Sequence, residues 1–419
     1  MNINHEYEFG GEYDVVVCGG GPAGFAAAVS SARRGAKTLL IEQGGCLGGL
    51  WTRGLLTWLI DTFGKGGLLD ELMDRLEMHA DGKRMPEISR FTADTEKTKL
   101  EMEKMCAEAG VDVLYHTLVS GAVVDSGRVN AVLTASKSGH VYFEAKYFID
   151  TTGDGDFAHL CGARYELGNE SGETQPLSLV AHLGGIDLSA FHDYDSRQVA
   201  SKDAKARILA DMSSVGIAPS YNSPLVAVLS EKYGSVAFMS NHEHKSGINA
   251  KDVTDATLHA RVELHKIVDG LRGTNDVWKD LHISATADMI GIREGRRIEG
   301  LYKLTREDVE SGKAFDDAVC NVTFNTDIHA LHADTKHAFE QKYGNIHPPY
   351  EIPLRALISA DFDNLLMGGR CISGDFVAHA SYRVAGPAFK TGEASGACAA
   401  YCVSAGILPR DAGDVSLFL

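Results

Sequence analysis

The chain has 419 residues, of which 44% are apolar, and it carries a formal net charge of −17. This length suits two domains or one large interleaved pair, and the acidic excess argues against nucleic acid and anionic membrane surfaces as partners. No apolar stretch is long enough to cross a membrane and the polar start is unlike a signal peptide, so we expect a cytoplasmic protein.

The first patterned stretch of the chain predicts a nucleotide-binding unit. An apolar, β-branched run at residues 14–18 predicts a buried parallel strand, which leads into a turn of the form Gly-x-Gly-x-x-Gly. Residues 26–34 predict a helix that ends at a glycine, and residues 37–41 predict a second strand that delivers Glu42.

Each part of this unit has a physical role in holding a dinucleotide. Gly19 permits the tight turn, Gly21 lets the backbone approach a pyrophosphate, and Gly24 lets helix and strand pack closely. The helix N-terminus then points free N–H groups at the phosphates. Glu42 can accept hydrogen bonds from a ribose and would repel a 2′-phosphate, which favours FAD or NAD over NADP.

A second glycine-rich loop, residues 44–52, follows the acid directly and predicts further backbone N–H groups around the same ligand. Helical periodicity is present at residues 68–79 and 95–109. From residue 111 to 149 the period changes to two, which predicts hairpin-like strands, and a strand at residues 147–150 leads into another glycine- and aspartate-rich turn.

The middle of the chain is less patterned than its two ends. It contains a strand candidate at residues 177–183 and a long helix candidate at residues 255–271. The C-terminal part regains α/β character, with a strand at residues 364–367, a glycine turn, and a helix at residues 388–404. No second Gly-x-Gly-x-x-Gly is present in the sequence, so we predict no separate nicotinamide domain.

Several blocks together carry a resemblance to a known family. They are residues 14–24 with Glu42, Leu47-Gly48-Gly49, residues 152–156, Gly291-Ile292-Arg293-Glu294-Gly295-Arg296-Arg297, and residues 364–373 with Arg383-Val384 and residues 391–396. Over nearly its whole length the chain resembles the FAD-dependent oxidoreductases of the glutathione-reductase-like flavoprotein superfamily, in particular those with a single dinucleotide-binding domain.

The resemblance implies an α/β fold: a Rossmann-like FAD-binding domain, made of a parallel sheet with a β-meander crossover, and an inserted α+β substrate domain. Residues 1–165 and 350–419 would form the discontinuous FAD-binding domain, and residues 166–349 the substrate or cap domain.

The resemblance also implies a bound FAD and the residues around it. The helix at residues 388–404 would aim its N-terminus at the flavin C2 carbonyl, where a helix dipole stabilises the charge of reduced flavin. Glu42 would hold the adenosine ribose, Val119 would lie against the adenine and Arg370 near the ribityl chain. The expected FAD-binding residues are Gly19, Gly21, Pro22, Ala23, Gly24, Glu42, Gln43, Gly48, Gly49, Thr52, Val119, Thr152, Gly153, Asp154, Gly369, Arg370, Gly386 and Thr391.

Three side chains are candidates for the chemistry. His379, in the segment between the ribityl-binding turn and the flavin-capping helix, is the first candidate for a general base. His182 is the second, with a buried core histidine as the alternative interpretation. Arg383 would bind an anionic substrate or stabilise reduced flavin, and the alternative is a plain ion pair.

Other reactive-looking residues are interpreted structurally. Arg293, Arg296 and Arg297 are interpreted as a solvated charged face rather than a carboxylate or flavin-phosphate site, and Cys46 as small-residue filling rather than a reactive thiol. No metal site is predicted, and the expected surface histidine groups are His242-Glu243-His244 and His329, His332 and His337.

We therefore predict an FAD-dependent oxidoreductase that transfers a hydride between flavin N5 and a small polar substrate, hydroxylated or carbohydrate-like. The alternatives are a flavoprotein of non-redox, RNA-modifying or thiazole-forming type, and a nucleotide-binding sensor that has lost turnover. The sequence leaves open the electron acceptor, covalent flavin attachment and assembly into a homo-oligomer.

Overall fold

The larger sheet grows from the strand that precedes the first glycine turn. The computed structural model describes residues 6–77, 90–196, 198–335, 338–340 and 346–419. In it, β1 (Glu8–Cys18) pairs in parallel with β2 (Thr38–Ile41) on one side and with β8 (Gly139–Asp150) on the other. Two further parallel strands join this centre: β5 (Asp112–Leu114) pairs with β2, and β17 (Leu365–Met367) pairs with β8.

Residues 139–150 form one strand where the sequence predicts two. The first half of β8 pairs antiparallel with β7 (Arg128–Ser136), and β7 pairs in turn with β6 (Leu118–Asp125). The second half pairs with β17. A single strand therefore belongs to both the meander and the parallel sheet, and the predicted α/β class with a Rossmann-like sheet and β-meander is confirmed.

The loops that the sequence analysis singled out all follow the carboxyl ends of strands in this sheet. The register aligns the carboxyl ends of β1, β2, β8 and β17. The residues that follow these four ends are Gly19, Glu42, Thr151 and Gly368. In open parallel sheets, ligands bind in the crevice outside the carboxyl ends where the chain turns to opposite sides, as it does around β1.

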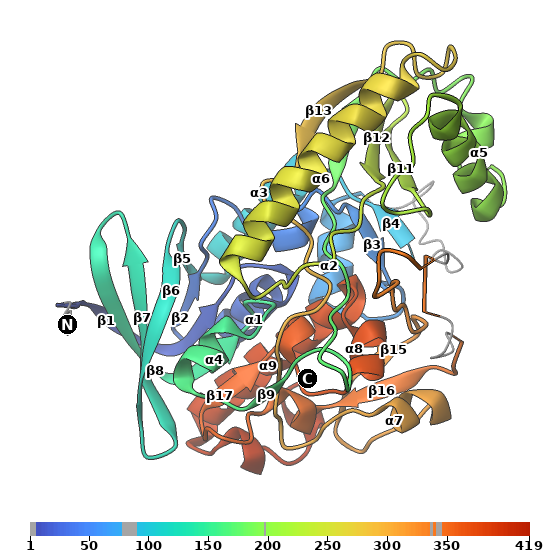
Figure 1. Ribbon diagram of the computed structural model, residues 1–419. Coiled ribbons are helices and arrows are strands. Elements are labelled where there is room, and N and C mark those ends of the chain that lie inside the picture. Colours follow the sequence, from blue (N-terminus) through green and yellow to red (C-terminus); the bar gives the residue numbers. More distant parts are fainter. Residues whose placement is uncertain (1–5, 78–89, 197, 336–337, 341–345) are drawn as a thin grey trace.

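Two helices pack against each other next to these strand ends, α1 (Pro22–Arg33) and α9 (Ala385–Ala405) (Figure 1). A Cβ on Gly392 would lie 2.0 Å from the Ala23 carbonyl oxygen, and one on Gly396 would lie 2.1 Å from that of Ala27. The Ser30 hydroxyl adds a hydrogen bond of 2.8 Å to the Glu393 carbonyl. Glycines one helical turn apart thus let the two backbones approach closely, and the helix predicted at residues 388–404 begins three residues earlier.

A second, antiparallel sheet has the strand order β11-β12-β10-β13 and lies beneath the long helix α6 (Ala250–Leu271) (Figure 1). It has its own apolar core, which includes Phe238, Leu264 and Trp278. The predicted helix at residues 255–271 is confirmed and starts earlier, because the Asn249 side chain caps it by accepting from two backbone N–H groups.

The stretch after this sheet returns to the first core. Ile298, Leu304 and Val322 pack in the same cluster as the β1 and β8 residues, and β15 (Ala318–Val322) pairs with β16 (Tyr350–Pro353). The boundaries predicted at residues 166 and 349 stay a prediction, and the packing groups residues 298–322 with the first sheet rather than with the second.

The remaining elements complete the two units. The helix predicted at residues 95–109 is present as α3. The helix predicted at residues 68–79 is present as α2 and ends at Arg75, and residues 78–79 lie outside the described residues. None of the helices in the described part of the chain combines the length and apolar character that crossing a membrane requires. The other bounds are α2 (Gly67–Arg75), α3 (Thr95–Ala109), α4 (Asp156–Cys161), α5 (Ser201–Ser214), α7 (Arg306–Ser311), α8 (Phe376–Tyr382), β3 (Trp58–Ile60), β4 (Arg90–Thr92), β9 (Tyr165–Glu166), β10 (Ala181–Gly184), β11 (Leu225–Ser230), β12 (Ser235–Met239), β13 (His282–Thr286) and β14 (Arg297–Ile298).

Candidate active site

The first glycine turn has the geometry that its three glycines predict. Gly19 has a φ of +101°, and a Cβ there would lie 2.6 Å from the Thr151 carbonyl oxygen, so only glycine fits. A Cβ on Gly24 would lie 1.7 Å from the Gly19 carbonyl oxygen, which accounts for the close helix–strand packing. A Cβ on Gly21 would meet no heavy atom within 4 Å. Open space therefore lies in front of the α1 N-terminus, where Pro22 and Ala23 begin the helix.

Glu42 joins the two glycine loops. Its carboxylate accepts hydrogen bonds from the backbone N–H groups of Gly20 at 2.7 Å and Gly44 at 2.6 Å, and it forms an ion pair with Arg53 at 3.2 Å. An ionised carboxylate has about four lone-pair positions. One oxygen thus keeps acceptor capacity for a ribose, while the neighbouring Gln43 is exposed to solvent.

The second glycine loop lies against the first. Gly48 donates its N–H to the Gly20 carbonyl at 2.8 Å, and a Cβ on Gly49 would lie 3.1 Å from the Gly21 Cα. The Thr52 side chain is 1% exposed and donates to the Leu47 carbonyl at 2.6 Å. The Thr52 hydroxyl therefore closes the loop, and contact of Thr52 with FAD stays a prediction.

The turn after β8 carries an ion pair. Asp154 binds Arg370 at 2.7 Å, and Gly153, with a φ of +87°, leaves room for the Arg370 guanidinium. The Arg370 Nε is buried and has no hydrogen-bond partner among the described residues. The Thr152 hydroxyl donates to buried Asp150 at 2.7 Å, and burial raises the pKa of Asp150 to about 6.

Two of the C-terminal residues predicted to bind FAD, Thr391 and Gly386, have structural roles. The Thr391 hydroxyl accepts the Gly369 N–H at 3.0 Å and donates to the Pro387 carbonyl, so this buried side chain positions Gly369. A Cβ on Gly386 would lie 1.7 Å from the Asp61 carbonyl oxygen, so Gly386 is needed for packing. Direct FAD contact by the Thr391 side chain is therefore not supported.

Val119 is the second residue of β6, the first strand of the meander, and lies close to Glu42 along the chain fold. It lies in β6 opposite Thr134, and its partly buried side chain packs against the first core. Two residues earlier, the Thr117 N–H donates to the Glu42 carbonyl at 3.1 Å. This link places Val119 beside the loop that would hold the adenosine, and its contact with adenine stays a prediction.

The two histidine candidates lie in different elements, and His379 is buried whereas His182 is partly buried. His379 lies inside helix α8, not in an open loop as predicted from the sequence, and it is 1% exposed. Its Nδ1 has no partner among the described residues, and burial, followed by the charges of Arg297, Arg383 and Arg370, keeps its pKa well below the usual value. His182 lies on β10 with its Nε2 3.2 Å from the Leu55 carbonyl, and burial lowers its pKa as well. Both imidazoles are therefore neutral at pH 7, and their surroundings disfavour the protonated form of each.

A polar cluster, which we call the arginine–histidine cluster, lies in front of α9. Gln175, His242 and His329 in it are buried, and Arg293, Asp327 and Arg383 are partly buried. His329 contacts Asp327 through Nε2 at 3.3 Å and His242 through Nδ1 at 3.0 Å. Burial and the charge of Arg293 lower the pKa of His329 to about 4. His242 also stacks on Tyr221, with ring centroids 3.9 Å apart.

This cluster overturns several interpretations made from the sequence. His242 and His329 are 5% and 6% exposed rather than solvated, whereas His332 is exposed as expected and His337 lies outside the described residues. The arginine run is not a helix face: it is an irregular segment that leads into the short strand β14 (Arg297–Ile298). Arg297 is buried in an ion pair with Glu294 at 2.5 Å, and Arg296 is 8% exposed. Nothing in the sequence relates His242 to His329, which is 87 residues away.

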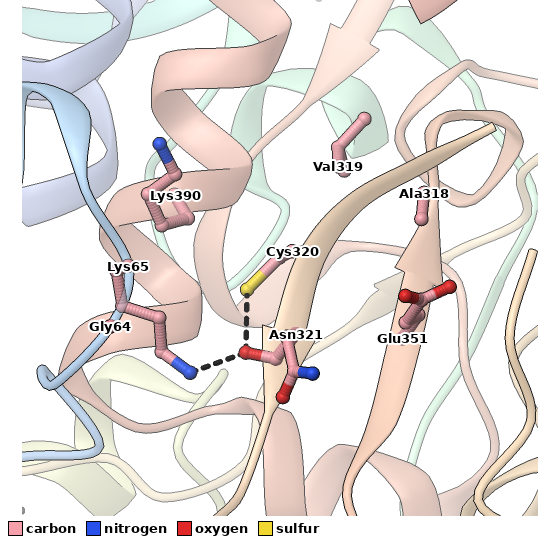
Figure 2. Close-up of a pocket in the computed structure, with 8 residues that line it drawn as sticks. All are labelled: Gly64, Lys65, Ala318, Val319, Cys320, Asn321, Glu351 and Lys390. Atoms are coloured by element: carbon pink, nitrogen blue, oxygen red, sulfur yellow. Dashed lines mark hydrogen bonds between the residues drawn. The ribbon is translucent and has the colours of Figure 1, made fainter.

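Three further features lie outside this site. Cys46 is half-buried and burial raises its pKa, which is the opposite of an activated thiol. Glu243, His259 and Glu263 come close enough to share a metal ion, but Glu263 is bound to Ser220 and His259 is exposed. A cavity of about 210 Å³ lies where β15 and α9 meet, and Lys65 there donates to the Asn321 carbonyl (Figure 2). None of the predicted site residues lines it.

Comparison with known proteins agrees with this geometry. The model of the family "FAD dependent oxidoreductase" matches residues 14–415 of the chain. Thiamine thiazole synthase from Aeropyrum pernix is 32% identical over 29% of this chain and 43% of its own length. A tRNA uridine 5-carboxymethylaminomethyl modification enzyme from Wolinella succinogenes is 29% identical over 42% of this chain and 30% of its own length. The chain thus spans about half or less of these curated relatives.

Solved structures share the fold across nearly the whole chain. A geranylgeranyl bacteriochlorophyll reductase-like protein from Thermoplasma acidophilum has a TM-score of 0.51 at 15% identity, covering 95% of this chain and 80% of its own. The flavin-dependent brominase Bmp2 also has a TM-score of 0.51, at 14% identity, covering 96% of this chain and 81% of its own. At these identities the likeness concerns the fold alone.

Proposed function

Since this chain belongs to the FAD dependent oxidoreductase family, we propose that it moves a hydride between FAD and a small polar substrate of hydroxylated or carbohydrate-like type. The enzyme class and the cofactor follow from the family. The substrate, the reacting bond and the residues that assist the reaction are the proposal. The observation that carries it is the arginine–histidine cluster in front of α9.

The residues at the sheet edge fit FAD. The open space before Gly21 matches a pyrophosphate, and the α1 N-terminus would direct backbone N–H groups at it. Glu42 keeps acceptor capacity for the ribose, and the buried, unpartnered Nε of Arg370 is a donor that needs an acceptor. Gly48 and Gly49 line the loop that faces Gly21, and the α9 N-terminus, which has no side-chain cap, would lie near the flavin ring.

When bound, FAD supplies N5, an acceptor for the hydride that leaves a substrate C–H bond. The chain must then take the proton from the adjacent O–H or N–H group. His379 and His182 are neutral bases with low pKa values, and we propose His379 as the first candidate because its Nδ1 lacks a partner. The burial of these residues supports a site that excludes water and so strengthens its hydrogen bonds.

The cluster favours a polar substrate over an apolar one. Arg383 Nε and the buried Gln175 side-chain nitrogen are donors without partners in the described part of the chain. Leaving such donors unsatisfied costs about 1–3 kcal/mol each, so a ligand with hydroxyl or other oxygen acceptors would recover that energy.

The test is anaerobic reduction of the FAD-loaded protein by polyols, sugars, amines and hydroxy acids, followed by loss of the flavin absorbance near 450 nm. Bleaching by a hydroxylated compound, with no bleaching by its fully deoxygenated analogue, is the expected result. A flavin that stays oxidised with every compound would contradict the proposal and favour the non-redox, thiazole-forming type of flavoprotein. The net charge of −17 disfavours the RNA-modifying type.

A further inference from the structure

The arginine–histidine cluster holds two partly buried arginines, and its carboxylates do not balance their positive charge. The guanidinium groups of Arg293 and Arg383 influence each other, since the charge of Arg383 contributes, after burial, to lowering the pKa of Arg293 to about 10. Asp327 is the acid whose charge acts on both of them. Glu294 also acts on Arg383, but it is already paired with Arg297 at 2.5 Å. Since His329 and His242 are neutral and add no charge, Asp327 is the carboxylate that the two arginines share.

Arg293 is held by neutral atoms. One of its terminal nitrogens donates to the Pro176 carbonyl at 2.6 Å and the Ser178 hydroxyl at 2.8 Å, and the other lies 3.7 Å from the Met239 sulfur. Among the described residues no carboxylate forms an ion pair with it. Partial burial of a charge without a paired carboxylate is costly, and a bound anion would offset that cost.

Arg383 has spare capacity as well. It binds the Asp327 carboxylate at 3.2 Å and the Asp327 carbonyl at 2.8 Å, both through the same terminal nitrogen. Its Nε has no partner in the described residues, nor does the side-chain nitrogen of Gln175, whose oxygen lies 3.4 Å from Arg383. Gln175 is 1% exposed, so this free donor is buried within the cluster.

The cluster is positioned to meet a substrate at the flavin. Arg383 immediately precedes Val384, the N-cap of α9, which is the helix that would face the flavin ring. Two residues before Arg293, a Cβ on Gly291 would lie 3.7 Å from the Leu50 side chain, which extends from the second glycine loop. The surplus charge thus lies between the two segments that would enclose the reacting end of FAD.

We infer that the substrate is a hydroxylated carboxylate, such as a hydroxy acid or a sugar acid, whose carboxylate binds between Arg293 and Arg383. Guanidinium groups bind carboxylates through paired, charge-assisted hydrogen bonds. The Gln175 side-chain nitrogen would donate a further hydrogen bond to an oxygen of the substrate carboxylate. The inference rests on the proposed function and narrows its substrate class. The two arginines would bind and orient the acid, while the hydroxyl-bearing carbon faces the flavin.

The first experiment compares charged and neutral probes of the same shape on the FAD-loaded protein. Flavin difference spectra and calorimetry are recorded with glycolate against glycolamide, and with glucuronate against glucose. At least one carboxylate should bind about tenfold or more tightly than its neutral partner. Equal affinity within both pairs, or no binding of either acid, would overturn the inference.

The second experiment removes the charges one at a time. Arg293→Met and Arg383→Met should each weaken the bound carboxylate at least about tenfold while the FAD content stays unchanged. Arg261→Met is the matched control, since Arg261 is also held by neutral oxygens, those of Thr286 and Ala287, but lies on α6 outside the cluster. If Arg293→Met binds the carboxylate as the wild type does, the assignment is wrong.

Two further readouts separate the possible failures. If the substitutions leave carboxylate binding intact but shift the flavin midpoint potential, the arginines stabilise reduced flavin instead of binding the substrate, and the inference is wrong. If polyols bleach the flavin while carboxylates neither bind nor bleach it, the proposed function stands and the inference falls. If carboxylates bind but no compound reduces the flavin, the proposed reaction falls while the anion site remains.

Discussion

At the scale of single residues, the absence of a side chain at Gly21 leaves the space that the pyrophosphate of FAD would occupy. A Cβ there meets nothing within 4 Å and the φ of −67° suits any residue, so Gly21→Val should fold with a melting temperature close to that of the FAD-free wild type. The valine side chain would occupy the pyrophosphate space, and the purified protein should contain essentially no FAD. The flavin absorbance per protein measures this.

Gly273, two residues after the end of helix α6, provides a matched control for Gly21→Val. Gly273 also has room for a side chain, with its nearest contact at 3.5 Å, so Gly273→Val should keep full FAD content. A Gly21→Val protein that purifies yellow with one FAD per chain would remove the first glycine turn from the pyrophosphate site.

Glu42 serves both the protein and the expected ribose. Glu42→Ala should weaken FAD binding by roughly 1.5–3 kcal/mol, the usual size of charge-assisted hydrogen bonds. The Gly20 and Gly44 N–H groups also lose their acceptor, so the FAD-free variant should unfold at lower urea than the wild type. Calorimetric titration with FAD gives the first quantity. Glu71→Ala, which removes a surface carboxylate paired with Arg33 and Arg75, should leave FAD affinity unchanged.

His379 tests the proton transfer. Its imidazole is buried, neutral and unpartnered at Nδ1, so His379→Gln should keep the FAD complex but slow substrate-driven flavin reduction by about 10²-fold or more. Anaerobic stopped-flow spectroscopy measures the rate once a reducing substrate is known. His182→Gln is the companion variant: a loss confined to it, with His379→Gln reducing at the wild-type rate, would transfer the role to His182.

At the scale of elements, the contact between α1 and α9 depends on two glycines. A methyl group on Gly392 would lie 2.0 Å from the Ala23 carbonyl oxygen, which is backbone and cannot move aside independently. Gly392→Ala should therefore lower the free energy of unfolding by about 2 kcal/mol or more, despite alanine's better helix propensity.

Urea unfolding of the FAD-free protein measures this cost. Ser404→Ala, at an exposed position near the end of the same helix, should change the stability by less than about 0.5 kcal/mol. Equal stability of Gly392→Ala and the wild type would mean that the two helices are not packed as closely as described.

At the scale of the whole molecule, buried neutral histidines should make the protein sensitive to acid. The pKa of His329 is lowered to about 4, and burial also lowers the pKa of His182, His242, His244 and His379. The unfolded chain binds protons on these groups near pH 6.5 and the folded chain does not, so stability falls as pH drops from about 6.5 towards 4. His329 alone should cost about 2 kcal/mol between pH 7 and pH 5.

Urea unfolding at the two pH values measures this dependence. His329→Gln should reduce the difference between pH 7 and pH 5, because glutamine has no proton to gain. Asp150 acts in the opposite direction, since its raised pKa of about 6 favours the folded state at low pH. If His329→Gln shows the same difference between the two pH values as the wild type, His329 is not the neutral buried group described here.

The sequence by itself determined the nucleotide-binding unit, because each of its signals is local. A β-branched run, three glycines at fixed spacing, a small-residue helix and Glu42 follow one another within about thirty residues. The turn geometry at Gly19 and the close contact at Gly24 are consequences of that short stretch. The helices at residues 95–109 and 250–271 were likewise predictable from periodicity and caps, apart from the exact start of the second.

Only the tertiary structure decided which polar residues meet in the site. Arg293, Asp327, His329 and Arg383 come from loops and helix ends that carry no periodic pattern, and His242 lies 87 residues from the histidine it contacts. Burial of a charged or titratable side chain depends on what packs over it, and that covering comes from segments distant in the chain. A local pattern therefore predicted where the cofactor would bind, whereas the surplus charge that distinguishes the substrate required the folded chain.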